Sequence, residues 1–118
     1  MEDRYLVEGI LRDVSRGRDV LVLARDDCAL APLVRAVERA GGDDAWARAV
    51  RTPGQQALTH RSGGRLWAKA LHARGHRGVS AHVAVVLDYS SMGLAERREV
   101  LINVPPALAA RDGDLMLR

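Results

Sequence analysis

Residues 82–88 read His-Val-Ala-Val-Val-Leu-Asp, and this short apolar stretch decides the fold class. A continuous apolar run rich in β-branched side chains is typical of a strand that is buried on both faces of a parallel sheet. Residues 20–24, Val-Leu-Val-Leu-Ala, form a second run of this kind. Two buried strands joined through helical crossovers are expected to be parallel neighbours with right-handed connections. The sequence therefore predicts an α/β fold.

Four helices are expected around these two strands. The first covers residues 5–15, where Leu6, Ile10 and Val14 recur at helical spacing. The other three are placed by residues that cap or end helices. They run from Asp26 or Asp27 to Gly41-Gly42 with Pro32 in the first turn, from Asp43 or Asp44 to Val50, and from Ser90 or Ser91 to a break at Pro105-Pro106.

A β-hairpin is expected in the middle of the chain, where residues 56–60 and 65–71 flank the turn at 62–64. The segment 65–71 fits a helix equally well, because Ala and Leu are strong helix formers. A last short strand is expected at 115–117. The predicted architecture is one domain over residues 1–118. It is a small three-layer α/β sheet with mainly parallel core strands plus the hairpin.

The composition excludes several kinds of site. Cys28 is the only cysteine, so neither an internal disulfide nor a cysteine metal cluster is expected. The four histidines have no cysteine or acidic residue close by in the sequence, so no metal site is expected at His60, His72, His76 or His82. No stretch reads as a secretory leader or as a membrane span. A cytoplasmic location and no membrane partner are therefore expected.

The charge is segregated along the chain, whose formal net charge is +3. No acidic residue lies between Asp44 and Asp88, whereas the stretch 48–77 is rich in arginine. Such a stretch indicates contacts with nucleic acid or with an acidic protein; the alternative is a solvated, arginine-rich surface. The candidate contact residues are Arg61, Arg65, Lys69, Arg74 and Arg77.

Three consecutive segments carry a resemblance to a known family. Residues 64–71 read Gly-Arg-Leu-Trp-Ala-Lys-Ala-Leu, residues 74–81 read Arg-Gly-His-Arg-Gly-Val-Ser-Ala, and residues 83–88 end at Asp88. Together they resemble the ATPase domain of phage terminase large subunits, in which a glycine turn leads a strand and an Arg-Gly loop leads into the Walker B strand. Residues 17–24 are similar to the strand after that family's phosphate-loop helix. The resemblance implies a P-loop-NTPase-like core, with Asp88 as a Walker B remnant and candidate magnesium ligand.

The chain departs from that family at the parts that carry catalysis. The phosphate loop is missing, and no lysine precedes Lys69. Tyr89 follows Asp88 where the family has a glutamate that activates water, and a phenol is no general base near neutral pH. A nuclease domain like that of the family is not expected either. A truncated P-loop-like fold without catalytic residues or a cofactor is therefore expected, since phosphoryl transfer needs these parts together.

Three functional hypotheses follow. The preferred one is a non-catalytic, terminase-like mini-protein of a phage or prophage that binds a protein, either itself or a host target. It would act as a regulator, an inhibitor or a host-directed toxin. The second is a DNA-binding module that uses the basic stretch 48–77. The third is an ATPase that another chain completes in trans.

Overall fold

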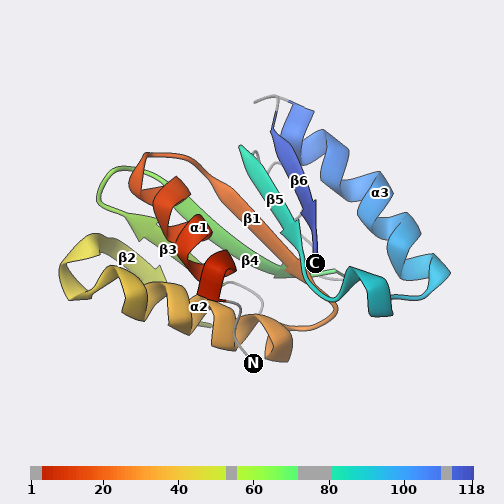
Figure 1. Cartoon of the computed structure of the whole chain (residues 1–118), viewed down its shortest axis with the longest axis horizontal. Helices are drawn as coiled ribbons and strands as arrows, with labels where there is room; N and C mark the ends of the chain where they lie inside the picture. Colours follow the sequence, from red (N-terminus) through yellow and green to blue (C-terminus); the bar gives the residue numbers. More distant parts are fainter. Residues whose placement is uncertain (1–3, 53–55, 72–80, 110–112) are drawn as a thin grey trace.

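The fold is built on one mixed sheet that packs against helices (Figure 1). The computed structural model describes residues 4–52, 56–71, 81–109 and 113–118. Its strands are β1 (Val20–Ala24), β2 (Trp46–Val50), β3 (Ala57–His60), β4 (Arg65–Ala70), β5 (Val83–Val86) and β6 (Asp114–Leu117). Its helices are α1 (Arg4–Ser15), α2 (Asp27–Gly41) and α3 (Leu94–Ala109), with the 3-10 turns η1 (Asp43–Ala45) and η2 (Tyr89–Ser91). None of the helices in these ranges is long and apolar enough to cross a membrane.

The centre of the sheet is parallel. The strand order is β2-β3-β4-β1-β5-β6, and β1 runs parallel to both of its neighbours, β4 and β5. At one edge β6 runs parallel to β5, and on the other side β3 pairs antiparallel with both β4 and β2. These pairings confirm the predicted parallel neighbours, the mainly parallel core and the hairpin. They also decide that residues 65–70 form a strand rather than a helix.

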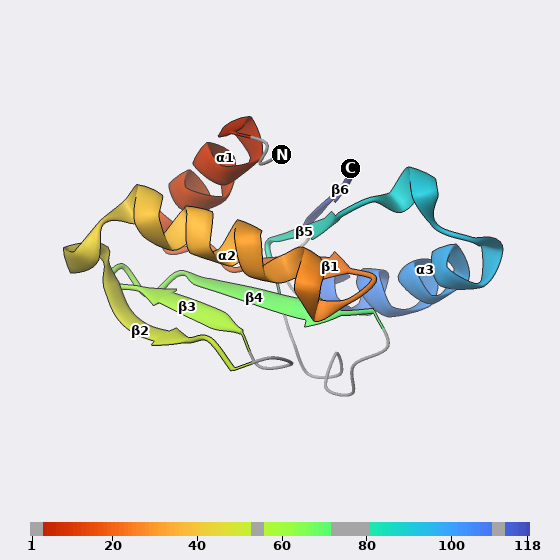
Figure 2. The ribbon, with the colours of Figure 1, turned by 90° about the horizontal axis from the view of Figure 1, so that it is seen from below.

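The sheet is covered on both faces, which confirms the three layers. In Figure 2, α1 and α2 lie on one face of the sheet and α3 lies on the other. Alternate residues of β1 belong to the two apolar clusters: Val20 and Val22 pack with α1 and α2, while Leu21 and Leu23 pack with α3. This double burial explains why residues 20–24 are apolar without a break, because successive side chains of a strand point to opposite faces.

The predicted short helix at 43–50 is wrong. Only η1 is helical there, and Trp46 begins the edge strand β2. The indole of Trp46 packs against the end of α2, where its Nε1 donates to the Glu38 carbonyl oxygen at 2.9 Å. Ala49 and Val50 pair with β3. Tertiary pairing therefore outweighs the helical preference of the alanines in this segment.

The prolines lie deeper inside helices than predicted. Pro32 lies in the second turn of α2, not the first, and the N-cap is Asp26, whose Oδ1 accepts a bond from the Ala29 amide at 2.9 Å. The predicted break at 105–106 is wrong, because α3 continues to Ala109. Buried side chains at Val104 and Leu108 hold this part of α3 against the sheet. Packing thus offsets the helical hydrogen bonds that Pro105 and Pro106 cannot donate.

The start of α3 also differs from the prediction. Ser90 and Ser91 belong to η2 and do not cap the helix. The helix begins at Leu94, and the Glu96 carboxylate reaches back to accept a bond from the Gly93 amide at 3.1 Å. A glutamate at this position satisfies one of the amides that a helix N-terminus leaves unpaired.

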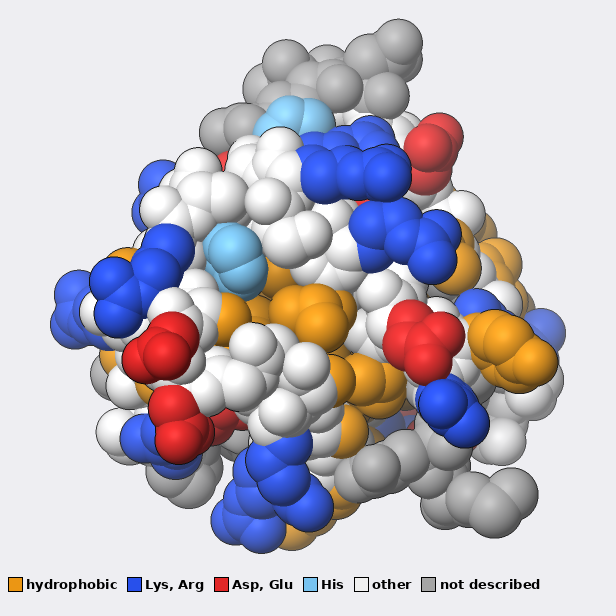
Figure 3. Space-filling view, turned by 60° about the vertical axis from the view of Figure 1, so that its left-hand side comes forward, with side chains coloured by type: hydrophobic (Ala, Val, Ile, Leu, Met, Phe, Trp, Pro, Cys, Tyr) orange, Lys and Arg blue, Asp and Glu red, His pale blue; other side chains and the backbone are white. Residues whose placement is uncertain are grey.

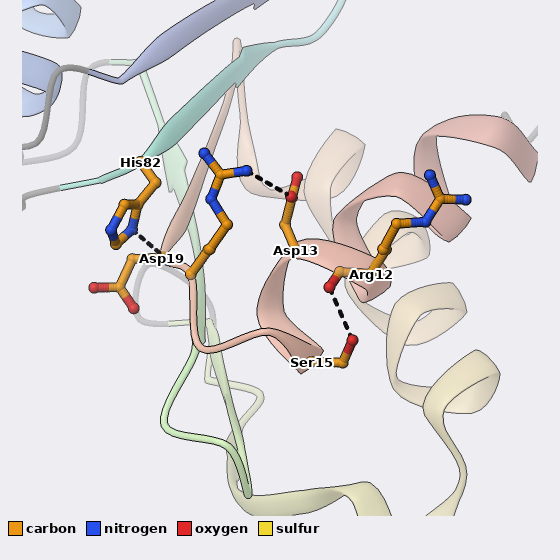
Figure 4. A network of polar contacts seen from close by, with 6 residues as sticks. Arg12, Asp13, Ser15, Asp19 and His82 are labelled. Carbon is orange, nitrogen blue, oxygen red and sulfur yellow. Dashed lines mark hydrogen bonds and ion pairs between the residues drawn. The ribbon is translucent and has the colours of Figure 1, made fainter.

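Asp19 fastens the amino ends of the three central strands, as Figure 4 shows for its bond with His82. Its side chain is only 4% exposed, and Oδ1 accepts a bond from the Arg65 amide at 3.1 Å. Its own amide donates to His82 Nδ1 at 2.9 Å, and its carbonyl oxygen accepts from the His82 amide at 2.8 Å. One buried residue thereby joins β1 to β4 and β5, and His82 has a structural role.

Candidate functional site

The carboxyl ends of β1 and β5 lie side by side at one end of the sheet. Leu23 is opposite Val86, and the Leu87 amide donates to the Leu23 carbonyl oxygen at 2.8 Å. From β1 the chain continues through α2 on one face, and from β5 through α3 on the other face (Figure 2). Ligands of open α/β sheets bind at such switch points, outside the carboxyl ends of the strands. Asp88, the predicted Walker B remnant, is located there.

Asp88 adopts a left-handed backbone conformation at this position, with φ 54° and ψ 31°. Its carbonyl oxygen accepts a bond from the Ser91 amide at 3.0 Å, which closes η2. Aspartate tolerates this conformation better than most residues do, so a turn-forming role accounts for it. Its carboxylate is exposed and makes no hydrogen bond or ion pair with other described residues.

The polar groups beside Asp88 are paired within the protein. Arg25 Nε donates to Glu96 Oε2 at 2.7 Å, and Arg25 Nη2 donates to the Ser91 carbonyl oxygen at 2.9 Å. The N-terminus of α2 is capped by the carboxylate of Asp26. A phosphate arriving here would have to displace a carboxylate from the helix N-terminus, where anions otherwise bind.

A metal site at this end of the sheet would need several His, Cys, Asp or Glu side chains close together. Within the described residues, no three His, Cys, Asp or Glu side chains come together in an arrangement that could hold a metal ion. Tyr89 is held by its surroundings: its amide donates to the Arg118 carbonyl oxygen at 2.8 Å, and the Arg97 guanidinium lies 5.1 Å from its ring centroid. The backbone amide and the ring of Tyr89 thus both take part in contacts within the protein.

Two of the predicted basic residues share a sheet face. Arg65 and Lys69 are an even number of residues apart on β4, on the side opposite Leu66 and Ala68, which pack in the cluster under α1 and α2. Trp67 lies between them, and the Arg65 guanidinium is 5.2 Å from its ring centroid. The structure therefore brings together a positive charge, an aromatic ring and a second positive charge.

Arg48 extends this basic face across the hairpin. It lies opposite Thr59 of β3, and Thr59 lies opposite Arg65 of β4, so the three side chains are cross-strand neighbours on one face. Sequence reasoning did not select Arg48 as a site residue. The sequence predicts a helix at 43–50, so the position of Arg48 on one face of an edge strand could not be recognised.

The remaining predicted basic residues are not part of this face in the described structure. Arg61 lies in the hairpin turn, where its Nε donates to the carbonyl oxygen of Asp44. Arg74 and Arg77 lie outside the described residues, as does the loop that carries much of the resemblance.

The outer edge of β6 presents backbone groups that pair with no other described residue. The amides of Asp114 and Arg118 donate towards β5, to the His82 oxygen at 2.9 Å and the Val86 oxygen at 2.8 Å. In a parallel pair, alternate residues of a strand direct both their N–H and their C=O groups to the same side. The N–H and C=O groups of Leu115 and Leu117 therefore face away from β5. No described strand lies on that outer side.

The side chains of this edge strand are apolar and accessible. Leu115 is 39% exposed, Met116 37% and Leu117 48%. No charge or proline interrupts these three residues. Exposed apolar strands with open edges are templates for pairing with another chain. Sequence reasoning predicted this strand but gave no sign that it lies at the edge.

The opposite edge, β2, is protected. Arg48 is exposed there, and the register shifts between Trp46 and Arg48. Charged side chains and irregular pairing are features that discourage further strand addition. Figure 3 turns this side of the molecule forward and shows basic side chains distributed around a central apolar area. The two sheet edges therefore differ in chemistry.

A hollow lies between α2 and the residues Arg51 and Gln56, which follow β2 and precede β3. Its lining includes Cys28, Val34, Arg35, Glu38 and Arg51. The Arg51 Nε donates to Glu38 Oε1 at 3.1 Å; this hydrogen bond, with the attraction between the charges, raises the pKa of Arg51 above its ordinary value. The charges of Arg51 and Glu38 neutralise each other, which leaves Arg35 as the remaining charge of this lining.

Comparisons with protein-family models, curated proteins and solved structures found no match for this chain.

Proposed function

We propose that this chain is a non-catalytic, terminase-like protein of phage or prophage origin that acts by binding a protein partner. The single observation that carries the binding function is the open edge of β6, with its outward backbone groups at Leu115 and Leu117. Addition of a strand to a sheet edge is a common mode of protein recognition, because the backbone supplies hydrogen bonds and the side chains supply specificity. A regulator or inhibitor can act through such an edge.

The terminase-like part of the proposal rests on the resemblance and on the placement of Asp88. Asp88 lies two residues beyond the buried parallel strand β5, near the carboxyl end of β1, which is the kind of position that a Walker B aspartate takes. The non-catalytic part is supported by what surrounds it. Arg25 is bonded to Glu96, Asp26 occupies the N-terminus of α2, and the only lysine, Lys69, lies on β4.

Substitution at the β6 edge is expected to abolish capture of a partner. In pull-downs from the natural host or from phage-infected cells, the Leu117→Lys variant should retain less than about a tenth of the partner that the unmodified chain retains, because a charge would be buried at the pairing edge. Mass spectrometry identifies the partner, and a titration with the purified partner then measures the loss of affinity.

The matched control is Leu101→Lys, which places the same charge on an exposed position of α3. Equal loss in both variants, or capture that neither substitution changes, contradicts binding at β6.

A separate measurement tests the non-catalytic part of the proposal. Thermal stabilisation by Mg-ATP that disappears in Asp88→Asn would establish a nucleotide site; asparagine is chosen because it tolerates the left-handed conformation that alanine does not.

A second candidate function is sequence-independent DNA binding by the basic face of the hairpin. It is favoured by the alignment of Arg48, Arg65 and Lys69 with Trp67 on one face. Arginine and lysine on an exposed surface contact phosphates, and such contacts weaken as the salt concentration rises, because releasing the counterions of the DNA into a more concentrated solution gains less free energy.

If this second function holds, Arg65→Glu with Lys69→Glu should weaken binding to a labelled duplex at least about tenfold at low salt, and should reduce the slope of log K against log salt by about 2. Fluorescence anisotropy at several salt concentrations measures both quantities. Arg35→Glu, an exposed charge on α2, should leave the affinity nearly unchanged. Equal weakening by Arg35→Glu, or no binding by the unmodified chain, would rule the basic face out.

A further inference from the structure

The residues of the β6 edge are complementary to the same residues read in the opposite direction. Residues 114–118 read Asp-Leu-Met-Leu-Arg, so the apolar centre is a palindrome and the two ends carry opposite charges. Reversing the direction of the strand therefore preserves the apolar residues and exchanges the charges. Resting on the proposed function of this edge, we infer that β6 pairs antiparallel with β6 of a second copy of this chain.

The hydrogen-bonding pattern of the edge selects one register. Residues that exchange hydrogen bonds across an antiparallel pair lie directly opposite each other. The outward groups belong to Leu115 and Leu117, so these must face outward residues of the second copy. With Met116 opposite Met116 of the second copy, Leu115 lies opposite Leu117 twice, and both contacts are hydrogen-bonded pairs.

The same register pairs the charges. Asp114 then lies opposite Arg118 of the second copy, and the symmetry creates this contact twice. Opposite charges directly across a strand pair are stabilising, whereas like charges are destabilising. A shift by two residues to Leu115 opposite Leu115 would place Asp114 against Met116 and lose both contacts between Asp114 and Arg118. A shift by one residue would turn outward backbone groups towards inward ones.

The faces of the sheet also match in this arrangement. Leu115 and Leu117 are in register with Ala84 and Val86, which belong to the cluster under α3. Leucines of both copies would therefore meet on the α3 side of a continuous sheet, and the Met116 pair would lie on the opposite face. The contact is isologous, with a two-fold axis through the Met116 pair, which closes the assembly at two copies.

The dimer is expected to be weak and reversible, with a dissociation constant on the order of tens of micromolar, because one short strand pair buries little area. Sedimentation velocity of the full chain over a wide concentration range should show a rapid monomer–dimer equilibrium. Salt should weaken it, since its charge contacts are solvent-accessible.

Charge reversal supplies the decisive test. Arg118→Asp alone places Asp114 opposite an aspartate twice, and Asp114→Arg alone places Arg118 opposite an arginine twice. Each single variant should weaken the dimer at least about tenfold. An equimolar mixture of the two variants should form a heterodimer of roughly the original affinity, because every contact in the mixed pair is again attractive. Circular dichroism of each variant confirms that the monomer is folded.

The outcomes separate this inference from the function on which it rests. A dimer with restored affinity in the mixture supports the antiparallel β6 contact. A monomer at all concentrations, together with β6-dependent capture of another protein, overturns self-pairing and leaves β6 as a binding edge. A dimer that both single variants keep overturns the register. A monomer without any β6-dependent partner overturns both.

Discussion

Replacement of Gly64 by alanine is expected to lower the free energy of unfolding by about 3 kcal/mol, because the site has no room for a side chain. A Cβ atom there would lie 2.2 Å from the Val14 carbonyl oxygen and 2.8 Å from the Arg18 carbonyl oxygen. Both are backbone atoms, so a side-chain rotation cannot relieve the overlap. Urea unfolding followed by circular dichroism measures the loss.

The contact at Gly64 joins two segments that are distant in sequence. The hairpin turn packs on the connection between α1 and β1, where Ser62 Oγ donates to the Val14 carbonyl oxygen at 2.6 Å. Gly9→Ala is the matched control, because nothing lies within 4 Å of a Cβ at Gly9 in α1. This substitution should stabilise the helix by about 0.5–1 kcal/mol. Equal stability of the Gly64→Ala variant and the unmodified chain would contradict this close packing.

The second large effect is expected at Leu23, whose replacement by alanine should cost about 3 kcal/mol. Leu23 is 1% exposed and lies in the central strand, on the face covered by α3. Its truncation leaves a cavity between β1 and α3 that the surrounding sheet is too rigid to close. The midpoint of urea unfolding should fall without a change in slope.

Leu101→Ala provides the comparison, since Leu101 on α3 is 60% exposed. Its effect should stay within about 0.5 kcal/mol, as is usual for surface substitutions. A similar loss in both variants would show that α3 buries a different face from the one described, and would contradict the third layer of the fold.

Much of the fold could be predicted from apolar patterning. The strands at 20–24 and 83–86, the helix ending at Ser15 and the hairpin are confirmed. In each of these segments local preference and burial favour the same structure. The continuous apolar runs were particularly informative, because only strands with both faces covered need them.

Errors arose where long-range contacts outweigh local preference. Residues 46–50 form a strand because Trp46 packs on α2 and its neighbours pair with β3. The helix α3 continues past 105–106 because buried residues on both sides hold it to the sheet. Neither contact is visible in a sequence window, since each depends on an element that the window does not contain.

The candidate site could be predicted only in part. The position of Asp88 at the end of a buried strand followed from the sequence, as did the basic character of the stretch 48–77. Which basic side chains share a face depended on strand register: Arg65 is aligned with Arg48 through β3, whereas Arg61 turns towards the carbonyl oxygen of Asp44. A shift of one residue would have placed them on opposite faces.

The sequence by itself determined an α/β protein with two buried parallel strands, because unbroken apolar runs between amphipathic helices have few other solutions. It also determined the self-complementary order of residues 114–118. Only the tertiary structure decided that this segment is an open edge while β2 is a protected one. Strand order follows from how helices pack on both faces of the sheet, so the backbone groups of Leu115 and Leu117 lie at a sheet edge only because β5 has paired with the other side of β6.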